Sequence, residues 1–244
     1  MPEFLIIALV VIGSYLLGNI NFALIIAKFK KIDLKKKGSG NLGTMNVSRN
    51  LGTKFGFLVL ILDVIKGAVP CILGWFLIGG LGFGEIDVVG VRFVSSGRIG
   101  AYIASLAVIL GHIYPVFLKF KGGKGIASTL GIMLVLQPFG TLITFALSFV
   151  FLVITKMGAV TSFIVTTVPV ILENISLPSF SESPYAIASA ILIFILFSLT
   201  IIAHRSNIVK LFSGTENKTR VFKTKEEKEL KRLGKLKELE EQKN

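Results

Sequence analysis

Seven apolar runs, most of them close to twenty residues long, constrain the fold of this chain more than any other feature. Apolar residues make up 52% of its 244 residues and charged residues only 17%, which is unusual for a water-soluble domain. A helix rises about 1.5 Å per residue, so about twenty apolar residues cross the roughly 30 Å hydrocarbon core of a bilayer. The sequence therefore predicts an all-α, polytopic integral membrane protein. The runs cover residues 4–27, 55–78, 99–118, 126–136, 139–155, 158–172 and 185–203.

The lengths of the runs limit the number of crossings. The first, second, third and last are long enough to span a bilayer, whereas the fourth is short and ends at Gln137-Pro138. We expect the fourth to be a short or re-entrant helix; the sixth is marginal, so five to seven spans are compatible with the sequence. The first run lacks a preceding basic segment and a small-residue cleavage site, so it is expected to be a retained membrane helix. The single cysteine, Cys71, lies inside an apolar run, which excludes an intramolecular disulfide and a cysteine-based metal site.

The basic residues set the expected orientation. The net charge is +13, with eight Lys or Arg between residues 28 and 54 and twelve after residue 203. A nucleic-acid-binding protein is excluded because the chain between these clusters is apolar. Cytoplasmic loops of membrane proteins carry an excess of Lys and Arg, which lie beside anionic lipid headgroups. Seven crossings with the N-terminus outside would place every lysine-rich loop and the C-terminus in the cytoplasm, and this agreement favours seven crossings over six.

The first polar segment, residues 38–52, reads Gly-Ser-Gly-Asn-Leu-Gly-Thr-Met-Asn-Val-Ser-Arg-Asn-Leu-Gly. Glycines allow the backbone to approach a bound group and to direct several N–H donors into one concavity, which suits an anion such as phosphate. Arg49 can add a bidentate hydrogen bond to the same oxygens. The alternative interpretation is a polar surface loop with helix-breaking glycines.

The second polar segment, residues 111–129, contains a glycine pair followed by Lys124-Gly125 and an expected helix start. Backbone N–H groups and an ammonium group then meet at the positive end of a helix, where an anion is favoured. The glycine spacing does not fit a nucleotide-binding P-loop, so ATP binding is not expected. The alternative is an interfacial turn whose lysine contacts lipid headgroups.

The third polar segment follows the last apolar run and begins His204-Arg205-Ser206-Asn207. His204 and Asn207 share a helical face, so both could contact a substrate. The alternative for this histidine is a helix cap or a headgroup contact. A polar face at the end of the last span therefore joins the other two segments on the same predicted side of the membrane.

Several polar groups lie within the apolar runs, where a polar group normally has a partner or a function. Asp63 and Lys66 are three residues apart and are expected to neutralise each other as a helical ion pair. His112 is expected to support the loop that follows it. Asn19 and Asn21 suit interhelical hydrogen bonds. Ser162 could line a substrate groove, or it could be a small helix-packing residue.

In their order along the chain, these segments resemble the bacterial acyl-phosphate:glycerol-3-phosphate acyltransferase family of the PlsY type. The resemblance runs from about residue 4 to about residue 217 and rests on residues 38–49, 63–67, 111–127 and 204–216. No one segment is specific alone, but three ordered segments on one predicted face are. Met45 and Leu42 depart from the family pattern, which usually has threonine and proline there. A methionine cannot donate the hydroxyl hydrogen bond of that threonine.

The resemblance implies transfer of a fatty acyl group from acyl phosphate to the 1-hydroxyl of glycerol 3-phosphate, giving lysophosphatidic acid and phosphate in the first acylation step of phospholipid synthesis. It implies a bacterial cytoplasmic (inner) membrane location, contact with membrane lipids, and no nucleic acid, cofactor or metal. The acyltransferase domain would cover residues 1–217, and residues 218–244 would form a charged cytoplasmic tail. The implied catalytic residues are Ser39, Arg49, His204 and Asn207. The implied substrate- and phosphate-binding residues are Gly38, Gly40, Asn41, Gly43, Asn46, Lys121, Gly122, Gly123, Lys124, Gly125 and Ser162, with Glu216 in a structural role.

The expected mechanism is direct transfer without an acyl-enzyme, because phosphate is a good leaving group and positioning with charge stabilisation can supply most of the catalysis. A histidine followed four residues later by aspartate is absent, since Val116 and Ile208 occupy those positions. The hydroxyl proton would go to His204 or to a phosphate oxygen. Two other classes compete with the enzyme: a small transporter or channel, disfavoured because no inverted repeat is visible, and a non-catalytic assembly partner.

Overall fold

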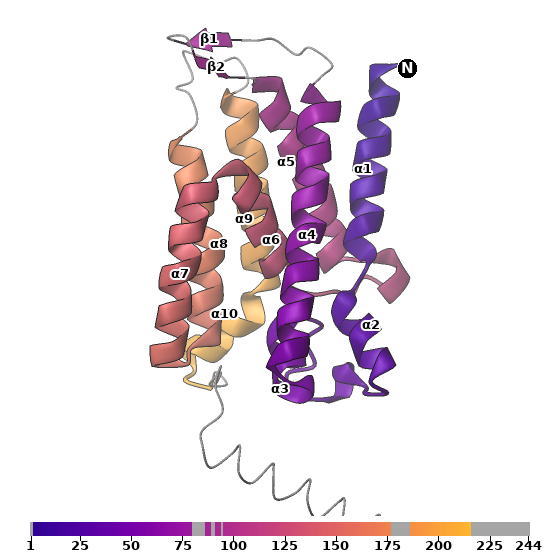
Figure 1. The fold of residues 1–244 in the computed structure, drawn as a ribbon, viewed down its shortest axis with the longest axis vertical. Helices are drawn as coiled ribbons and strands as arrows, with labels where there is room; N and C mark the ends of the chain where they lie inside the picture. Colours follow the sequence, from indigo (N-terminus) through magenta and orange to yellow (C-terminus); the bar gives the residue numbers. More distant parts are fainter. Residues whose placement is uncertain (1, 80–85, 89–90, 94, 177–185, 216–244) are drawn as a thin grey trace, which may run out of the picture.

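The computed structural model describes residues 2–79, 86–88, 91–93, 95–176 and 186–215 as a bundle of helices with roughly parallel axes (Figure 1). Two short 3₁₀ helices, η1 (Leu34–Lys36) and η3 (Val116–Leu118), lie in the connections between α-helices. The strands β1 (Ile86–Val88) and β2 (Val91–Phe93) pair antiparallel. The α-helices are α1 (Glu3–Asn19), α2 (Phe22–Phe29), α3 (Thr44–Leu51), α4 (Thr53–Leu77), α5 (Ser95–Ile113), α6 (Ile126–Leu136), α7 (Pro138–Thr155), α8 (Gly158–Ile175), α9 (Ala186–Ala203) and α10 (Arg205–Phe212).

Each of the seven apolar runs forms helix in the described part of the chain, as the sequence predicts. Five helical segments there are long and apolar enough to cross a membrane, and six if the bent pair α9–α10 counts as one span. The expected short helix is α6, whose 11 residues extend about 16 Å, roughly half of a hydrocarbon core. Helix α6 begins inside the bundle (Figure 1). Five or six candidate spans lie within the expected range of five to seven, and the favoured number of seven crossings stays a prediction.

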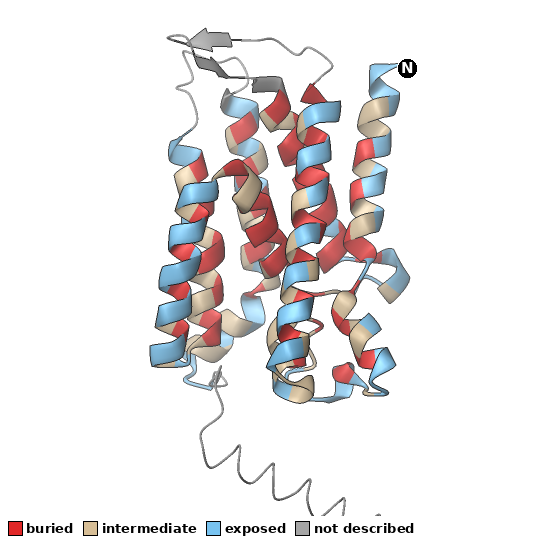
Figure 2. Ribbon diagram, viewed as in Figure 1, coloured by how far each residue is buried: buried red, intermediate tan, exposed pale blue. Residues whose placement is uncertain are grey.

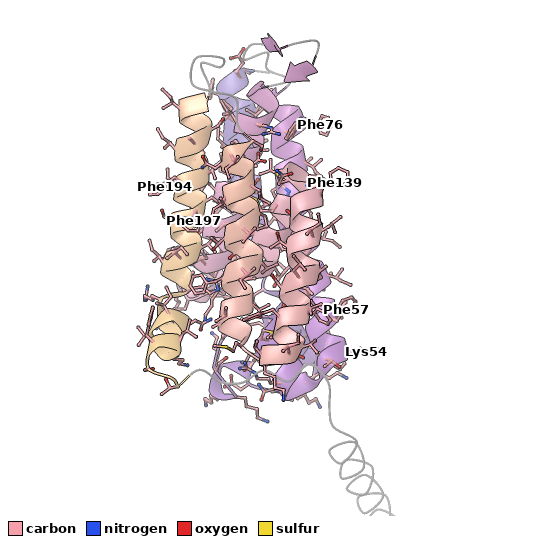
Figure 3. The ribbon with its side chains drawn as sticks, turned by 90° about the vertical axis from the view of Figure 1, so that its left-hand side faces the viewer. Lys54, Phe57, Phe76, Phe139, Phe194 and Phe197 are labelled. Atoms are coloured by element: carbon pink, nitrogen blue, oxygen red, sulfur yellow. The ribbon has the colours of Figure 1, made fainter. Side chains whose placement is uncertain are left out.

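The bundle is apolar on its outer surface as well as in its interior. Figure 2 shows buried residues facing the spaces between helices and exposed residues facing outward. Phe57, Phe139 and Phe194 project from α4, α7 and α9 and are 63%, 80% and 65% exposed (Figure 3). An outward apolar surface on this scale is unfavourable in water and suits contact with lipid. The protein is therefore a multi-pass membrane protein.

Helices α4 and α6 meet backbone to backbone. A Cβ atom on Gly67 would collide with the carbonyl of Ser128, and one on Gly131 would collide with the carbonyl of Val64. Small residues allow membrane helices to approach this closely. The contact fixes the beginning of α6, and therefore the polar residues that precede it, against α4.

The first apolar run, expected to be one helix, is broken. Helix α1 ends at Asn19 and α2 begins at Phe22, and the side-chain oxygen of Asn21 caps α2 by accepting from the backbone N–H of Leu24 at 2.9 Å. Helices α2, α3 and α10 gather at the end of the bundle opposite the N-terminus (Figure 1). The break therefore turns the chain toward the end that carries the first and third polar segments.

Candidate active site

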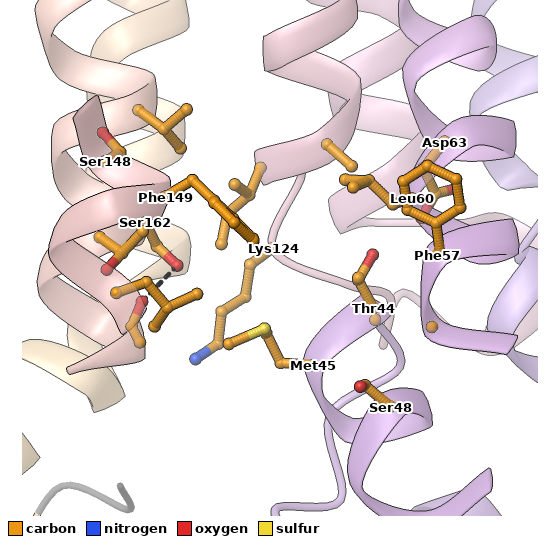
Figure 4. A pocket seen from close by; sticks show the side chains of 18 of the residues that line it. Thr44, Met45, Ser48, Phe57, Leu60, Asp63, Lys124, Ser148, Phe149 and Ser162 are labelled. Atoms are coloured by element: carbon orange, nitrogen blue, oxygen red, sulfur yellow. Dashed lines mark hydrogen bonds between the residues drawn. The ribbon is translucent and has the colours of Figure 1, made fainter. Parts of the chain in front are cut away.

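A cavity of about 680 Å³ lies between two groups of helices (Figure 4). Helices α3 and α4 form one wall, α7 and α8 form the other, and residues 124–127 lie between them. The two walls are mostly apolar. Apolar lining residues include Phe57, Leu60, Ile126, Phe145, Phe149, Leu152 and Val165, and the polar ones include Asn41, Thr44, Ser48, Asp63, His112, Lys124, Thr161 and Ser162.

Asn46 organises the glycine-rich loop beside this cavity. Its side-chain oxygen accepts from the backbone N–H of Ser39 at 3.1 Å, and its amide nitrogen donates to the carbonyls of Lys37 at 3.1 Å and Leu34 at 3.3 Å. Gly38, with φ of +61°, lies directly against this amide, where a Cβ atom would collide with the Asn46 oxygen. The loop is therefore held around one buried side chain rather than by its own regular structure.

Helix α3 begins at the cavity. The carbonyl of Gly43 accepts from the backbone N–H groups of Asn46 and Val47, both at 3.1 Å, and Thr44 and Met45 of the first turn line the cavity (Figure 4). The first N–H groups of a helix have no partner inside the helix, and the N-terminus carries a partial positive charge. The cavity is therefore bordered by a helix end that favours an anion.

The Gly122-Gly123 pair folds back on the end of α5. The backbone N–H of Gly122 donates to Ile113 O at 3.0 Å, and that of Gly123 donates to His112 O at 3.1 Å. Gly123 also touches the imidazole, because a Cβ atom there would collide with His112 Nε2. The other imidazole nitrogen, Nδ1, lies 3.3 Å from Ser128 Oγ. As the sequence indicates, His112 lies beneath the loop that follows it.

The second and third polar segments meet at one hydrogen bond. Lys124 Nζ donates to Asn207 Oδ1, although the two residues are 83 positions apart in the sequence. Asn207 lies on α10, which is bent by 56° from α9. The bend brings the polar start of α10 to the lysine, and so joins the end of the bundle to the cavity.

His204 occupies the bend between α9 and α10 and is 1% exposed. Its Nδ1 lies 2.7 Å from the carbonyl of Thr200, which can only accept, so Nδ1 carries the proton. Nε2 then has a lone pair, and it is buried without a hydrogen-bond partner in the described part of the chain. The ring packs on Phe163, with 5.3 Å between ring centroids. The histidine is positioned as a buried acceptor rather than as a solvent-facing cap.

The structure brings some of the predicted site residues into the cavity wall and leaves others outside it. Those that line the cavity are Asn41, Gly43, Lys124, Gly125 and Ser162. Those that do not are Gly38, Ser39, Gly40, Asn46, Arg49, Lys121, Gly122, Gly123, His204 and Asn207.

The predicted site residues outside the cavity wall differ in how they relate to the cavity. Ser39, Arg49 and Lys121 are exposed and are not among the residues that line the cavity. Asn207 is tied to the cavity through Lys124. Glu216 lies outside the described residues. The Ser162 hydroxyl lines the cavity but donates to Gly158 O at 2.8 Å, as a helix-packing serine does.

Sequence reasoning did not assign several polar residues of the cavity wall to the site, among them Thr44, Ser48 and Asp63. Thr44 and Ser48 are four residues apart and therefore share a helical face, a signal that required α3 to be recognised as a helix. Asp63 forms the expected ion pair with Lys66 at 2.9 Å, and the cavity contact adds to that pairing. Within the described part of the chain, no three His, Cys, Asp or Glu side chains converge to hold a metal ion.

These features define a helical membrane protein whose cavity joins apolar walls to basic and amide groups. Such a cavity suits a substrate with an anionic head and an apolar tail. A sequence model of the glycerol-3-phosphate acyltransferase family matches residues 8–214. The chain belongs to this family of acyltransferases.

Individual relatives agree with the family match. The chain is 39% identical to the glycerol-3-phosphate acyltransferase of Thermoanaerobacter pseudethanolicus, over 86% of this chain and 94% of the relative. It is 38% identical to glycerol-3-phosphate acyltransferase 2 of Bacillus anthracis, over 86% of this chain and 97% of the relative.

The fold is also similar to crystal structures of PlsY (YgiH), described as an integral membrane glycerol 3-phosphate acyltransferase. Its glycerol 3-phosphate form superposes with a TM-score of 0.70 and 32% identity, over 87% of this chain and 94% of that one. Its lysophosphatidic acid form has a TM-score of 0.66 and 33% identity over the same shares.

Proposed function

We propose that this acyltransferase uses acyl phosphate as its donor and transfers the fatty acyl group to the 1-hydroxyl of glycerol 3-phosphate. The products are lysophosphatidic acid and inorganic phosphate, and the reaction is the first acylation of phospholipid synthesis. Crystal structures of the PlsY relative in glycerol 3-phosphate and lysophosphatidic acid forms support this acceptor and this product. The chemistry of the cavity supports the donor.

The observation that carries the proposal is the position of Lys124. Its ammonium group lies against Asn207 in a cavity whose walls are mostly apolar, and the N-terminus of α3 borders the same cavity. A cation in the cavity wall and a helix N-terminus favour an anion, while the apolar walls favour a hydrocarbon chain. An acyl phosphate has both parts in one molecule.

The acyl chain lies between α4 and α7 in this proposal. Phe57 and Leu60 of α4 face Phe149 of α7 across the cavity (Figure 4). A chain in this position extends toward the lipid, and its carbonyl reaches the polar end near Lys124. Burying apolar surface stabilises the complex by about 0.8 kcal/mol per methylene group, so the walls can hold the donor while the polar end aligns it.

The two glycine-rich segments provide two anion sites for two phosphate-bearing substrates. Lys124 binds the phosphate of glycerol 3-phosphate through its ammonium group, because the backbone N–H groups of Gly122 and Gly123 already donate to the end of α5. Ser39, Arg49 and the start of α3 bind the phosphate of the donor, and Asn46 holds that loop in shape through its hydrogen bonds to residues 34–39. Asn207 positions the acceptor through its contact with Lys124, and His204 lies at the bend that brings Asn207 there.

Transfer then proceeds directly, without a covalent enzyme intermediate. The 1-hydroxyl oxygen of glycerol 3-phosphate attacks the carbonyl carbon of the donor. A new ester C–O bond forms, the bond from that carbon to the phosphate oxygen breaks, and its electron pair leaves with phosphate. The hydroxyl proton passes to a phosphate oxygen of the substrate, because His204 is buried and does not line the cavity. Lys124 and the α3 N-terminus stabilise the charge that develops.

The site faces the cytoplasm of a bacterial cell in this proposal. Helices α2, α3 and α10 lie together at the end of the bundle away from the N-terminus (Figure 1). The same end carries the lysines of residues 28–54, and basic loops are retained on the cytoplasmic side. The N-terminus is then outside, and the soluble acceptor reaches the site from the cytoplasm.

The test supplies purified full-length protein with palmitoyl phosphate and labelled glycerol 3-phosphate, without CoA or acyl carrier protein. We expect equal amounts of lysophosphatidic acid and inorganic phosphate. Palmitoyl-CoA in place of palmitoyl phosphate is the matched control and is expected to give no product. Turnover with palmitoyl-CoA alone would refute the donor, and phosphate uptake into proteoliposomes without product would favour a transporter.

A further inference from the structure

We infer that Lys66 is a positioning residue of the active site: its ammonium group holds the break between α1 and α2 and, through Asn21, the loop at residues 41–43. This role rests on the proposed function, because it assigns the loop to substrate phosphate. It goes beyond the neutral ion pair that the sequence predicts for Lys66 and Asp63.

Lys66 makes two polar contacts inside the bundle. Its Nζ lies 2.9 Å from Asp63 Oδ1 and donates to the backbone carbonyl of Ile20 at 2.8 Å. The ammonium group also lies 5.6 Å from the centre of the Phe22 ring. Both partners of the ion pair are buried, with Lys66 2% and Asp63 3% exposed. The lysine therefore joins α4 to the junction of α1 and α2.

The Ile20 carbonyl accepts from Lys66 because the helix stops there. In a continuous helix this carbonyl would accept from the N–H of Leu24. That N–H donates instead to the side chain of Asn21 at 2.9 Å, and Ile20 has an extended backbone with φ of −68° and ψ of 113°. Lys66 supplies the hydrogen bond that the break removes, so the break and the lysine depend on each other.

Asn21 connects the break between α1 and α2 to the loop of the active site. Its Nδ2 donates to the carbonyl of Leu42 at 3.3 Å, and the neighbours of Leu42, Asn41 and Gly43, line the cavity. Leu42 is 4% exposed and packs in one cluster with Ala23 and Ala27 of α2. A shift of the break along α4 would therefore move the loop with α2.

Stability alone gives a weak reason for this arrangement. A buried ion pair often stabilises a protein no more than an apolar pair of similar size, and ionisable residues inside a membrane bundle usually serve a function. Neutralising Asp63 would need only the contact between the two side chains. The additional bond to Ile20 O joins the pair to the loop, which a charge-balancing role does not require.

The test uses full-length protein with palmitoyl phosphate and glycerol 3-phosphate and measures kcat, both KM values and thermal unfolding. The double variant D63N/K66M removes the hydrogen bond to Ile20 without leaving an unpaired charge, and N21A cuts the next link. R49K identifies which substrate binds the loop, because it weakens that contact directly. E173Q is the matched control, since Glu173 forms a buried ion pair with Arg98 at 3.1 Å that does not contact the cavity.

R49K should raise the KM of one of the two substrates. We expect D63N/K66M and N21A each to raise the KM of that same substrate by about tenfold or more, and to leave the KM of the other substrate within about twofold of the wild-type value. The effects of D63N/K66M and N21A on that KM should be less than additive in the combined variant, because both disrupt the same series of contacts from Lys66 to the loop. E173Q should lower the unfolding temperature without changing either KM.

Wild-type kinetics in D63N/K66M, or an equal change in both KM values, would overturn the positioning role. If D63N/K66M does not fold, K66R tests the positioning role instead. This variant keeps the positive charge, but its larger head group displaces the Ile20 carbonyl. An unchanged KM for both substrates in K66R would refute the inference. A wild-type protein that turns over another donor but not palmitoyl phosphate refutes the proposed donor instead, and the same variants are then compared on that donor.

Discussion

Asn46 offers the sharpest test of how the glycine-rich loop is built. Its side chain makes three hydrogen bonds to the backbone of residues 34–39 and accepts a fourth from Asn50 Nδ2 at 3.0 Å. Each bond contributes about 0.5–1.5 kcal/mol net. Asn46→Ala should therefore cost the ordered loop about 2–4 kcal/mol, since water can replace part of what is lost on the exposed side.

That cost converts to activity through the fraction of molecules with an ordered loop. Because about 1.4 kcal/mol is a factor of ten, 2–4 kcal/mol corresponds to a decrease in kcat/KM of roughly 30- to 700-fold. The helices should remain folded, because the hydrogen bonds that the described residues make with the Asn46 side chain all lie within residues 34–50. The assay is palmitoyl transfer to labelled glycerol 3-phosphate, with thermal unfolding measured in parallel.

Asn46→Asp is the matched control for this prediction. It keeps an oxygen acceptor for the N–H of Ser39 but removes the donors to Lys37 O and Leu34 O. The loop should therefore be less disordered in this variant than in Asn46→Ala. The new carboxylate should repel the substrate phosphate, and this repulsion should grow at high pH. A folded Asn46→Ala protein with activity within about threefold of wild type would refute the view that this side chain orders the loop.

Three further predictions concern the loops. Ser39→Ala and Arg49→Ala should each abolish transfer while the protein stays folded and membrane-inserted; near-normal turnover in both would remove this segment from the active site. Gly123→Ala should lower kcat/KM and the unfolding temperature, because overpacking against the His112 ring costs about 1–3 kcal/mol; His112→Ala should restore part of the loss in the double variant, and no recovery would contradict the predicted collision. A cysteine at position 39 should resist an impermeant maleimide added outside intact cells and react after permeabilisation, since the native Cys71 is buried; labelling from outside would reverse the proposed orientation.

The apolar helices could be predicted because the lipid outside the bundle and the core inside it both require apolar side chains. Each of these helices is apolar over most of its surface, so length and hydropathy located all seven runs, and Gln137-Pro138 marked the end of the short one. The break at Ile20 could not be read in the same way, since apolar residues continue through it. The signal present was the pair Asn19 and Asn21, which suggested hydrogen bonding but not a change of direction.

The sequence predicted which segments lie near the cavity better than which side chains line it. Glycine, lysine and amide residues in order along the chain pointed to the segments that contain Asn41, Gly43, Lys124 and Gly125 of the cavity wall, and anion binding by these segments stays a prediction. The contact of Lys124 with Asn207 depends on the bend at His204, and a local pattern carries no information on residues 83 positions apart. Helix α3 was hidden because its polar, glycine-flanked sequence matches a loop, so Thr44 and Ser48 were not assigned to one face.

The central claim is that the donor binds with its acyl chain between α4 and α7 and its phosphate near the N-terminus of α3. The direct measurement uses a non-hydrolysable palmitoyl phosphonate with a photoreactive diazirine at mid-chain, irradiated with the full-length protein in lipid vesicles and mapped by mass spectrometry. We predict labelling of α4 and α7 at residues 57–60 and 145–152, suppressed by excess palmitoyl phosphate. Labelling that palmitoyl phosphate suppresses on α1 or α5, with none on α4 or α7, would contradict the account.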